Sequence, residues 1–182
     1  MKIQVSVGHS MLKNGYITSA DGTVFGGGNE YKYCKCFARV LERELKAAGH
    51  KVTVLQVPER AVINQAAEKA YKIKRYNAGY DLNIELHLNA AGNAKAKGTE
   101  ALYKSTNGKK YATSICNNLA VLWANRGQKQ RADLYFLNVT KAPAVLLELF
   151  FCTNKEEWQK AKKESVQKKM AKLITEAINS VK

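Results

Sequence analysis

The distribution of apolar residues along the chain predicts strands and helices in alternation. Residues 3–7 alternate between apolar and polar side chains with a period of two, which is typical of a strand. From Asn29, a favourable helix N-cap, apolar residues recur at helical spacing as far as Gly49. The later apolar runs continue the alternation and predict strands over 52–57, 81–89, 99–103, 134–137 and 144–151, with helices over 61–77, 108–125 and 155–181.

This order of elements predicts the fold class. Strands that alternate with helices are typical of an α/β domain, so we expect a three-layer αβα arrangement. Its sheet should be mixed but mostly parallel, with about six strands flanked by helices. The run from Ala144 to Phe151 is almost entirely apolar, as expected of a central strand that is covered on both faces.

Composition agrees with a single globular domain over residues 1–182. Hydrophobic residues make up 46% and charged residues 25% of the 182, and two prolines leave no Pro-rich linker. No apolar run approaches the roughly 20 residues that cross a bilayer, and residues 1–9 are too short and polar for a signal peptide. We therefore expect synthesis in the cytoplasm, no membrane insertion, a monomer, and no visible wall-binding domain.

The net charge and the cysteines narrow the choice of partners only slightly. A formal charge of +15 favours attraction to a polyanion, which could be nucleic acid, an anionic membrane or an anionic cell-wall polymer. The four cysteines match neither a zinc motif nor a dense disulfide framework, so we expect free thiols.

Four polar residues that could bind a metal follow or interrupt the predicted strands and helices. His9 follows the first strand, Glu30 opens the first helix, and His87 ends the third strand. Ligands in open α/β sheets bind beyond the carboxyl ends of the strands, and two histidines with one carboxylate form a catalytic zinc set with room for water. Glu148 interrupts an apolar strand, where a charge is costly without a partner or function, and it could act as general base.

Several short motifs then occur in order along the chain. They are Val7-Gly8-His9, Asn29-Glu30-Tyr31, residues 45–52, residues 81–90, Gly98-Thr99-Glu100, and a C-terminal series from Arg126-Gly127 through 134–137 and 143–148 to 154–157. Together they resemble the zinc-dependent N-acetylmuramoyl-L-alanine amidases of the Amidase_3 type, particularly the catalytic domains of phage endolysins. The resemblance covers essentially the whole chain.

The resemblance implies a reaction and a role for each site residue. His9, Glu30 and His87 fall on the three zinc ligands of the family, and Glu148 falls on its catalytic glutamate. The family cleaves peptidoglycan at the amide between the lactyl group of N-acetylmuramic acid and the first L-alanine of the stem peptide. A zinc-activated water would attack this amide, with Glu148 as general base and then general acid.

One position departs from the commoner pattern of the family. Glu85 stands two residues before His87, where a small polar residue is usual. Residues i and i+2 of a strand share a face, so Glu85 should point to the same side as His87. It could orient a metal ligand, face a cation of the substrate, or form a salt bridge with a lysine or arginine. If Glu85 were itself a ligand, the assignment of Glu30 would weaken.

Other polar positions near the predicted site remain open. Asn89 could contact the peptide backbone or make a turn, and Glu100 could contact substrate or lie on the sheet surface. Gly26-Gly27-Gly28 lacks the spacing of a phosphate-binding loop, which favours a flexible loop beside the metal.

Two further functions compete with the zinc amidase. A basic nucleic-acid-binding module should show a clustered basic stripe or a known motif, whereas the basic residues here are dispersed, so we expect no nucleic acid partner. A zinc peptidase with another peptide substrate would need a fixed cation for the carboxylate, and lysines are abundant. If the amidase interpretation holds, the charge favours anionic wall polymers such as teichoic acids, and an endolysin-like release to the cell wall.

Overall fold

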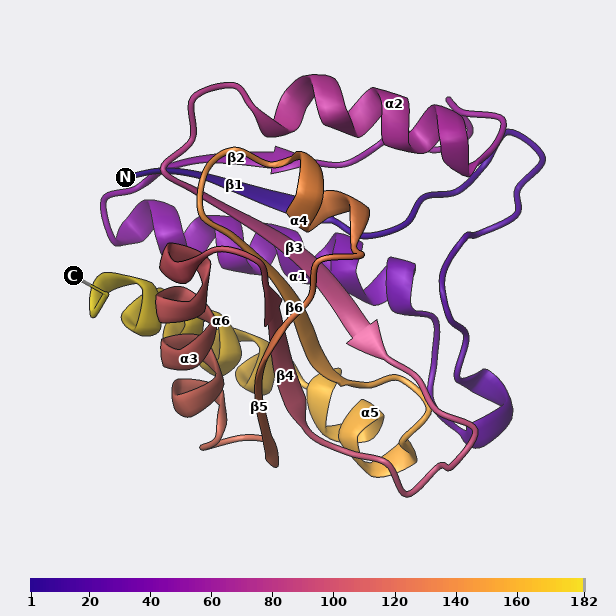
Figure 1. Ribbon diagram of the computed structural model, residues 1–182. Helices are drawn as coiled ribbons and strands as arrows, with labels where there is room; N and C mark the ends of the chain where they lie inside the picture. The colour runs from indigo at the N-terminus through magenta and orange to yellow at the C-terminus, as the bar shows by residue number, and fades with distance from the viewer. Residues whose placement is uncertain (182) are drawn as a thin grey trace.

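The protein, described by a computed structural model over residues 1–181, is built on a six-stranded sheet with the strand order β2-β1-β3-β6-β4-β5. The strands and helices follow one another along the chain as shown in Figure 1. The strands are β1 (Lys2–Val7), β2 (Lys51–Leu55), β3 (Leu82–Asn89), β4 (Thr99–Tyr103), β5 (Asn125–Gln130) and β6 (Ala144–Phe151). The helices are η1 (Thr23–Phe25), α1 (Glu30–Ala47), α2 (Gln65–Tyr76), α3 (Thr106–Leu119), α4 (Tyr135–Val139), α5 (Lys155–Ala161) and α6 (Glu164–Asn179).

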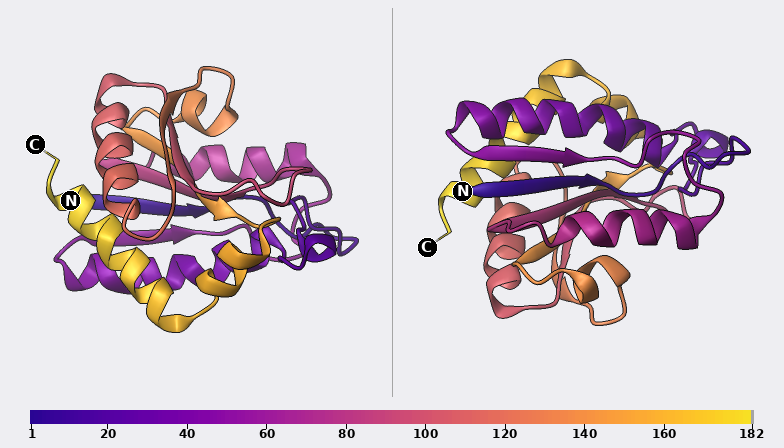
Figure 2. Two further views of the ribbon diagram at one scale, coloured as in Figure 1. Left: turned by 90° about the horizontal axis from the view of Figure 1, so that it is seen from below. Right: turned by 90° about the horizontal axis from the view of Figure 1, so that it is seen from above.

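Helices cover both faces of the sheet, which confirms the predicted three layers. Figure 2 shows α1 and α2 on opposite sides of the strands. The larger apolar core joins α1, α3 and α6 to one face of the sheet and includes Phe37, Ile115 and Ile174. A smaller apolar cluster lies on the other face, where Phe136 of α4 packs with Leu146 and the ring of Tyr76 from α2.

The sheet is mostly parallel, as predicted, and one pairing is antiparallel. Strands β2, β1, β3 and β6 run parallel to one another, whereas β4 runs antiparallel to β6. The register places His87 of β3 opposite Glu148 of β6, and Glu148 opposite Glu100 of β4. Three polar side chains therefore occur side by side across neighbouring strands.

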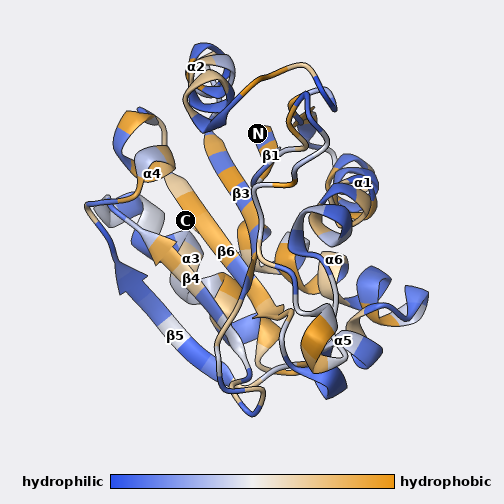
Figure 3. Cartoon of the chain, turned by 90° about the vertical axis from the view of Figure 1, so that its right-hand side faces the viewer, coloured by the Kyte–Doolittle hydropathy of each residue, from blue (hydrophilic) through white to orange (hydrophobic). Residues whose placement is uncertain are grey.

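Hydropathy distinguishes the centre of the sheet from its edge. Figure 3 shows β6 as largely hydrophobic and β5 as hydrophilic, in keeping with their sequences AVLLELFF and NRGQKQ. β6 lies between β3 and β4, whereas β5 is an edge strand. Charged residues at a sheet edge discourage pairing with other chains, which accounts for the polarity of β5.

Two local predictions were wrong, and they concern the same part of the chain. Residues 134–137 were expected as a strand, but they lie in and just before α4, where Phe136 and Leu137 are buried against the sheet. The helix expected over 108–125 ends at Leu119, and Asn125 instead begins β5. A short apolar run does not distinguish a strand from a buried helix, and a polar edge strand lacks the apolar alternation that marks a strand.

The C-terminal helix is interrupted. One helix was expected over 155–181, but α5 ends at Ala161 and α6 begins at Glu164, with Lys163 in an extended conformation between them. The interruption turns the chain so that α6 packs along α1 and α3. Within residues 1–181, no helix combines the length and hydrophobicity that a membrane span requires.

The glycine-rich loop before α1 was expected to be flexible, but it is packed against the segment that follows β6. A Cβ atom on Gly27 would lie 1.7 Å from the carbonyl oxygen of Cys152, and one on Gly28 would lie 2.1 Å from the Trp158 ring. The amide of Gly28 also donates to the Cys152 carbonyl. The glycines therefore permit a close contact between this loop and the segment after β6.

Candidate active site

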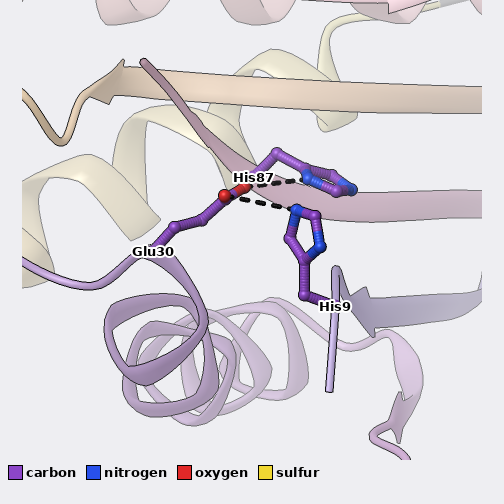
Figure 4. Close-up of side chains that lie close together, drawn as sticks. All are labelled: His9, Glu30 and His87. Atoms are coloured by element: carbon purple, nitrogen blue, oxygen red, sulfur yellow. Dashed lines mark hydrogen bonds and ion pairs between the residues drawn. The ribbon is translucent and has the colours of Figure 1, made fainter. Parts of the chain in front are cut away.

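His9 is the first residue of the site, and its backbone is strained. It directly follows β1 and Gly8, and its φ is 59°, a left-handed value that is uncommon for residues other than glycine. Outliers of this kind persist where the surrounding structure over-determines them, and they cluster at functional sites. The turn directs the imidazole toward the ends of β1 and β3, as seen in Figure 4.

Glu30 enters the same space from the first turn of α1. The side chain of Asn29 caps this helix by accepting from the amide of Lys32 at 3.1 Å, as the sequence predicts. The Glu30 carboxylate is buried, and it accepts backbone hydrogen bonds from Leu88 at 3.0 Å and Ala20 at 3.1 Å. These bonds fix the carboxylate against the end of β3.

The two histidines converge on Glu30, as Figure 4 shows. His87 Nδ1 lies 2.9 Å from Glu30 Oε1, and His9 Nε2 lies 3.2 Å from Glu30 Oε2. The imidazole rings meet edge to face, with centroids 4.9 Å apart. One potential ligand atom from each of the three residues lies within 4.8 Å of the others, so the structure brings together the three predicted metal ligands.

The charges of this cluster are mutually dependent. Burial opposes ionisation of Glu30, but hydrogen bonds with His87 and then His9 hold the pKa of its carboxyl below the usual range. Burial likewise disfavours a charged His87, but the Glu30 and Glu85 carboxylates outweigh it and raise the pKa of His87 to about 10. Without a metal ion, a proton on His87 balances the surrounding carboxylates.

Glu148 lies next to this cluster, but its Oε2 makes no hydrogen bond to it. It stands opposite His87 in the β3–β6 register, and its Oε2 atom is buried without a hydrogen-bond partner. Burial is the main cause that raises the pKa of this carboxyl to about 7; His87 opposes the shift, and Glu30 and Glu100 add to it. A carboxyl with a pKa near 7 and one oxygen free of hydrogen bonds is suited to proton transfer.

Glu85 contacts the ring nitrogen of His87 that points away from Glu30. Its Oε1 lies 3.2 Å from His87 Nε2, and its Oε2 accepts from Tyr76 at 2.7 Å and from Ser6 at 3.1 Å. The ammonium of Lys72 lies 3.6 Å from the same Oε2. Two of the predicted alternatives therefore occur together: Glu85 contacts a histidine of the cluster and also forms an ion pair.

Glu100 of β4 lies on the opposite side of Glu148 from His87, and Asn89 lies at the end of β3. Arg126 and Lys129 both donate to Glu100 Oε2, at 2.9 Å and 2.6 Å. Burial disfavours the charged form of Glu100, but hydrogen bonds from Lys129 and Arg126 hold the pKa of its carboxyl below the usual range. Asn89 ends β3, and its backbone carbonyl accepts from the amide of Cys152 at 2.8 Å.

Gly8 and Lys72 also contribute to the site, although neither was predicted as a site residue. A Cβ atom on Gly8 would lie 2.4 Å from the His87 ring and 2.7 Å from the Leu86 carbonyl oxygen, so only glycine permits this approach. Lys72 is only 4% exposed, although lysine is almost never fully buried unless paired. The position of Gly8 directly before a candidate ligand was visible in the sequence, whereas the burial of Lys72 was not.

A pocket opens beside the histidines on the side of the sheet covered by α2 and α4. Its volume is about 220 Å³, and His9, His87 and Glu85 line one wall. Lys69 and Lys72 of α2 line another wall, and apolar side chains of α4 and β6 complete it. The space suits a small part of a larger substrate beside the cluster.

Comparison with known proteins agrees with this geometry. Residues 3–180 match the Amidase_3 family, described as N-acetylmuramoyl-L-alanine amidase. Among solved structures, the catalytic domain of the CD27L endolysin targeting Clostridia Difficile is 49% identical, with a TM-score of 0.92 over 98% of this chain and 97% of that one. The CwlD amidase of Clostridioides difficile, solved in complex with the GerS lipoprotein, shares the fold with a TM-score of 0.84 at 21% identity, over 99% of this chain and 97% of that one.

Curated relatives extend beyond the matched region. An uncharacterized protein of Clostridium perfringens, CPE1502, is 30% identical over 98% of this chain and 52% of its own length. The amidase LytC of Bacillus subtilis is 33% identical over 56% of this chain and 21% of its own length. The chain thus spans about half or less of these relatives. With the family match over nearly its whole length, the chain belongs to the N-acetylmuramoyl-L-alanine amidase family.

Proposed function

We propose that the protein is a zinc-dependent peptidoglycan hydrolase that cleaves the amide between N-acetylmuramic acid and the L-alanine of the stem peptide. The observation that carries this proposal is the placement of Glu148, whose Oε2 is buried without a hydrogen-bond partner, directly opposite His87 and next to the cluster of His9 and Glu30. The family supplies the class of substrate. The geometry supplies a metal-capable triad and a separate proton acceptor.

The donor set fits zinc. Two imidazole nitrogens and one carboxylate oxygen form a common catalytic zinc set, and bonds of about 2.0–2.1 Å at tetrahedral angles place ligand atoms about 3.3 Å apart. His9 Nε2 lies 3.2 Å from Glu30 Oε2 and His87 Nδ1 lies 2.9 Å from Glu30 Oε1, and one ligand atom from each of the three residues lies within 4.8 Å of the others. A zinc ion bound there would supply Lewis acidity, lowering the pKa of the attacking water and polarising the amide carbonyl.

The remaining chemistry belongs to Glu148. With a pKa raised to about 7 by burial, its carboxylate can accept a proton from the attacking water near neutral pH. The same carboxyl can then donate that proton to the amine nitrogen of the departing L-alanine. Because Glu148 Oε2 makes no competing hydrogen bond, both transfers can occur without breaking a contact within the protein.

The neighbouring polar residues have supporting roles in this proposal. Glu85 orients His87 by accepting from Nε2, which leaves Nδ1 to face the metal. Glu100 is engaged by two cations and acts on Glu148 through its charge, raising the pKa of the base. Asn89, half-buried at the end of β3, remains a candidate for contact with the stem peptide.

The wider setting follows from the charge and from the relatives. We propose a monomeric catalytic domain that acts on the cell wall in the manner of an endolysin, with no nucleic acid partner. The +15 charge would draw it to anionic wall polymers through long-range attraction. The zinc peptidase alternative shares the same metal cluster and differs only in the bond cleaved.

Product analysis of digested walls tests this function. Purified peptidoglycan treated with the protein should gain new L-alanine amino termini without gaining reducing sugars. A chelator should stop the release, and zinc should restore it. New D-amino acid termini would indicate the peptidase instead, and reducing sugars would indicate a glycosidase; either result would overturn the proposal.

A further inference from the structure

Helix α2 places a buried ion pair beneath the two histidines. Lys72 and Glu68, one turn apart, are 4% and 8% exposed, and Lys72 Nζ lies 3.1 Å from Glu68 Oε1. Withdrawing two charges from water is expensive, and buried ion pairs often stabilise a fold no better than apolar residues of similar size. The other contacts of Glu68 and Lys72 therefore indicate whether the pair has a role besides stabilising the fold.

Glu68 reaches the turn that carries His9. Its Oε2 accepts from the hydroxyl of Ser10 at 2.8 Å and from that of Thr18 at 3.3 Å. Ser10 is fully buried and directly follows His9, and its amide donates to Thr18 Oγ1 at 3.1 Å. Glu68 thus anchors the residue next to a left-handed backbone conformation that needs support from its surroundings.

Lys72 reaches the other histidine through Glu85. Its ammonium lies 3.6 Å from Glu85 Oε2, and Glu85 Oε1 contacts His87 Nε2 at 3.2 Å. Tyr76, one turn further along α2, donates to the same Glu85 oxygen. Residues of α2 therefore hold the Glu85 carboxylate against Nε2 of His87. The positive charge of Lys72 compensates the negative charge of Glu85, which would otherwise be buried near Glu30 and Glu68.

We propose that the Glu68–Lys72 pair is a positioning unit for both histidines. It holds His9 through Ser10 and His87 through Glu85, and so presents the two rings to a metal in a fixed orientation. The proposal rests on the zinc site of the proposed function and adds α2 to the parts of the chain on which that site depends. Groups that orient metal-binding histidines typically change metal affinity 10- to 100-fold when they are removed.

The test compares Lys72→Met with Lys74→Met, which removes an exposed lysine from the same helix. Zinc affinity is measured by competition with a chelating dye, and the Nε2 proton of His87 is followed by NMR in the zinc-loaded protein. We expect Lys72→Met to weaken zinc binding about 10- to 100-fold and to accelerate exchange of that proton. Lys74→Met should leave both unchanged.

A second variant tests the other arm of the unit and does not depend on Lys72. Ser10→Ala removes the hydroxyl that joins the His9 turn to Glu68, and we expect a severalfold loss of zinc affinity with the His87 proton unaffected. Urea unfolding of each metal-free variant separates these effects from general destabilisation. Unchanged zinc affinity in both Lys72→Met and Ser10→Ala overturns the inference, whereas a wild-type protein that binds no zinc overturns the proposed function itself.

Discussion

His87 and Glu148 face each other in register on the neighbouring parallel strands β3 and β6. Adjacent strands lie about 4.8 Å apart, so the sheet itself fixes the separation between a candidate metal ligand and the candidate base. Glu148 has no hydrogen bond to hold its Oε2, and its position comes from the backbone of a central strand. Metal binding and proton transfer should therefore be separable by mutation.

Glu148→Gln should abolish hydrolysis while preserving zinc binding. The amide keeps the size of the side chain but cannot accept the proton of the attacking water, and loss of a general base costs about 10²- to 10⁴-fold in rate. Release of L-alanine amino termini from purified walls measures the rate, and metal analysis measures zinc content. Glu164→Gln, which changes an exposed residue at the start of α6, is the control. Near-normal turnover in Glu148→Gln would remove Glu148 as the base.

The same variant should be more stable than the wild type, in a pH-dependent manner. The pKa of Glu148 is raised from 4.5 to about 7, so its ionisation in the folded protein is unfavourable. The penalty is absent at pH 4, where the carboxyl is protonated in both states, and complete above about pH 7. We expect metal-free Glu148→Gln to gain about 1–3 kcal/mol in unfolding free energy at pH 8 and almost nothing at pH 4. Equal gains at both pH values would contradict this explanation.

Gly8→Ala should damage the site although it adds only a methyl group. The new Cβ would lie 2.4 Å from the His87 ring and 2.7 Å from a backbone oxygen, so either the ring or β3 must move. We expect a loss of about 1–3 kcal/mol in stability together with weakened zinc binding. Gly92→Ala is a matched control, because no atom lies within 4 Å of its added Cβ. Wild-type zinc affinity in Gly8→Ala would show that the close approach is not required.

Zinc uptake should release a proton from His87. Its pKa is raised to about 10 in the metal-free protein, so the ring is charged at pH 8, whereas a ligand must be neutral. The stabilisation from the charged ring is present below its unfolded pKa of about 6.5 and disappears as the pH rises through about 10. The apparent dissociation constant for zinc should fall about tenfold per pH unit between pH 8 and 9.5.

Calorimetry in buffers of different ionisation enthalpy counts the released proton directly. Above about pH 7 Glu148 is already ionised, so it contributes little to this count. Zinc affinity that does not vary with pH over this range would mean that His87 binds no proton in the metal-free protein.

Attachment to the cell wall should depend strongly on salt. The excess of 30 Lys and Arg over 15 Asp and Glu acts through solvent, where the screening length falls from about 10 Å at 0.1 M salt to about 3 Å at 1 M. Binding of the inactive Glu148→Gln variant to purified walls should weaken at least tenfold across this range. Walls stripped of teichoic acid should bind weakly at both salt concentrations. Equal binding to intact walls at the two concentrations would exclude charge as the means of attachment.

Much of the fold could be predicted from the sequence because its central strands are strongly patterned. The apolar run of β6 and the helical spacing in α1 each have one interpretation, and together they predict an α/β domain. β5 could not be found in this way, because its edge position leaves it polar on both faces. The helical conformation of residues 135–139 depends on packing against β6, which no local pattern reveals.

The site could be predicted only as a set of residues and not as an arrangement. His9, Glu30 and His87 occur at the ends of predicted elements, and the fold brings them together. The contacts of Glu85 with Lys72 and Tyr76 depend on where α2 crosses the sheet, a tertiary relationship. Periodicity specifies which face of a helix is apolar, but it does not specify which polar residues beneath that helix will meet.

Because β6 lies between β3 and β4, assembly of the candidate metal cluster and completion of the sheet are two separate steps in folding. The segment from β1 to β3, which includes α1, is synthesised before β6 and carries all three candidate ligands, His9, Glu30 and His87. β6 emerges last of the strands and must insert between β3 and β4 to unite the two halves of the sheet. Because that strand carries Glu148, the three candidate ligands can come together early, but the candidate base joins them only when the sheet is complete.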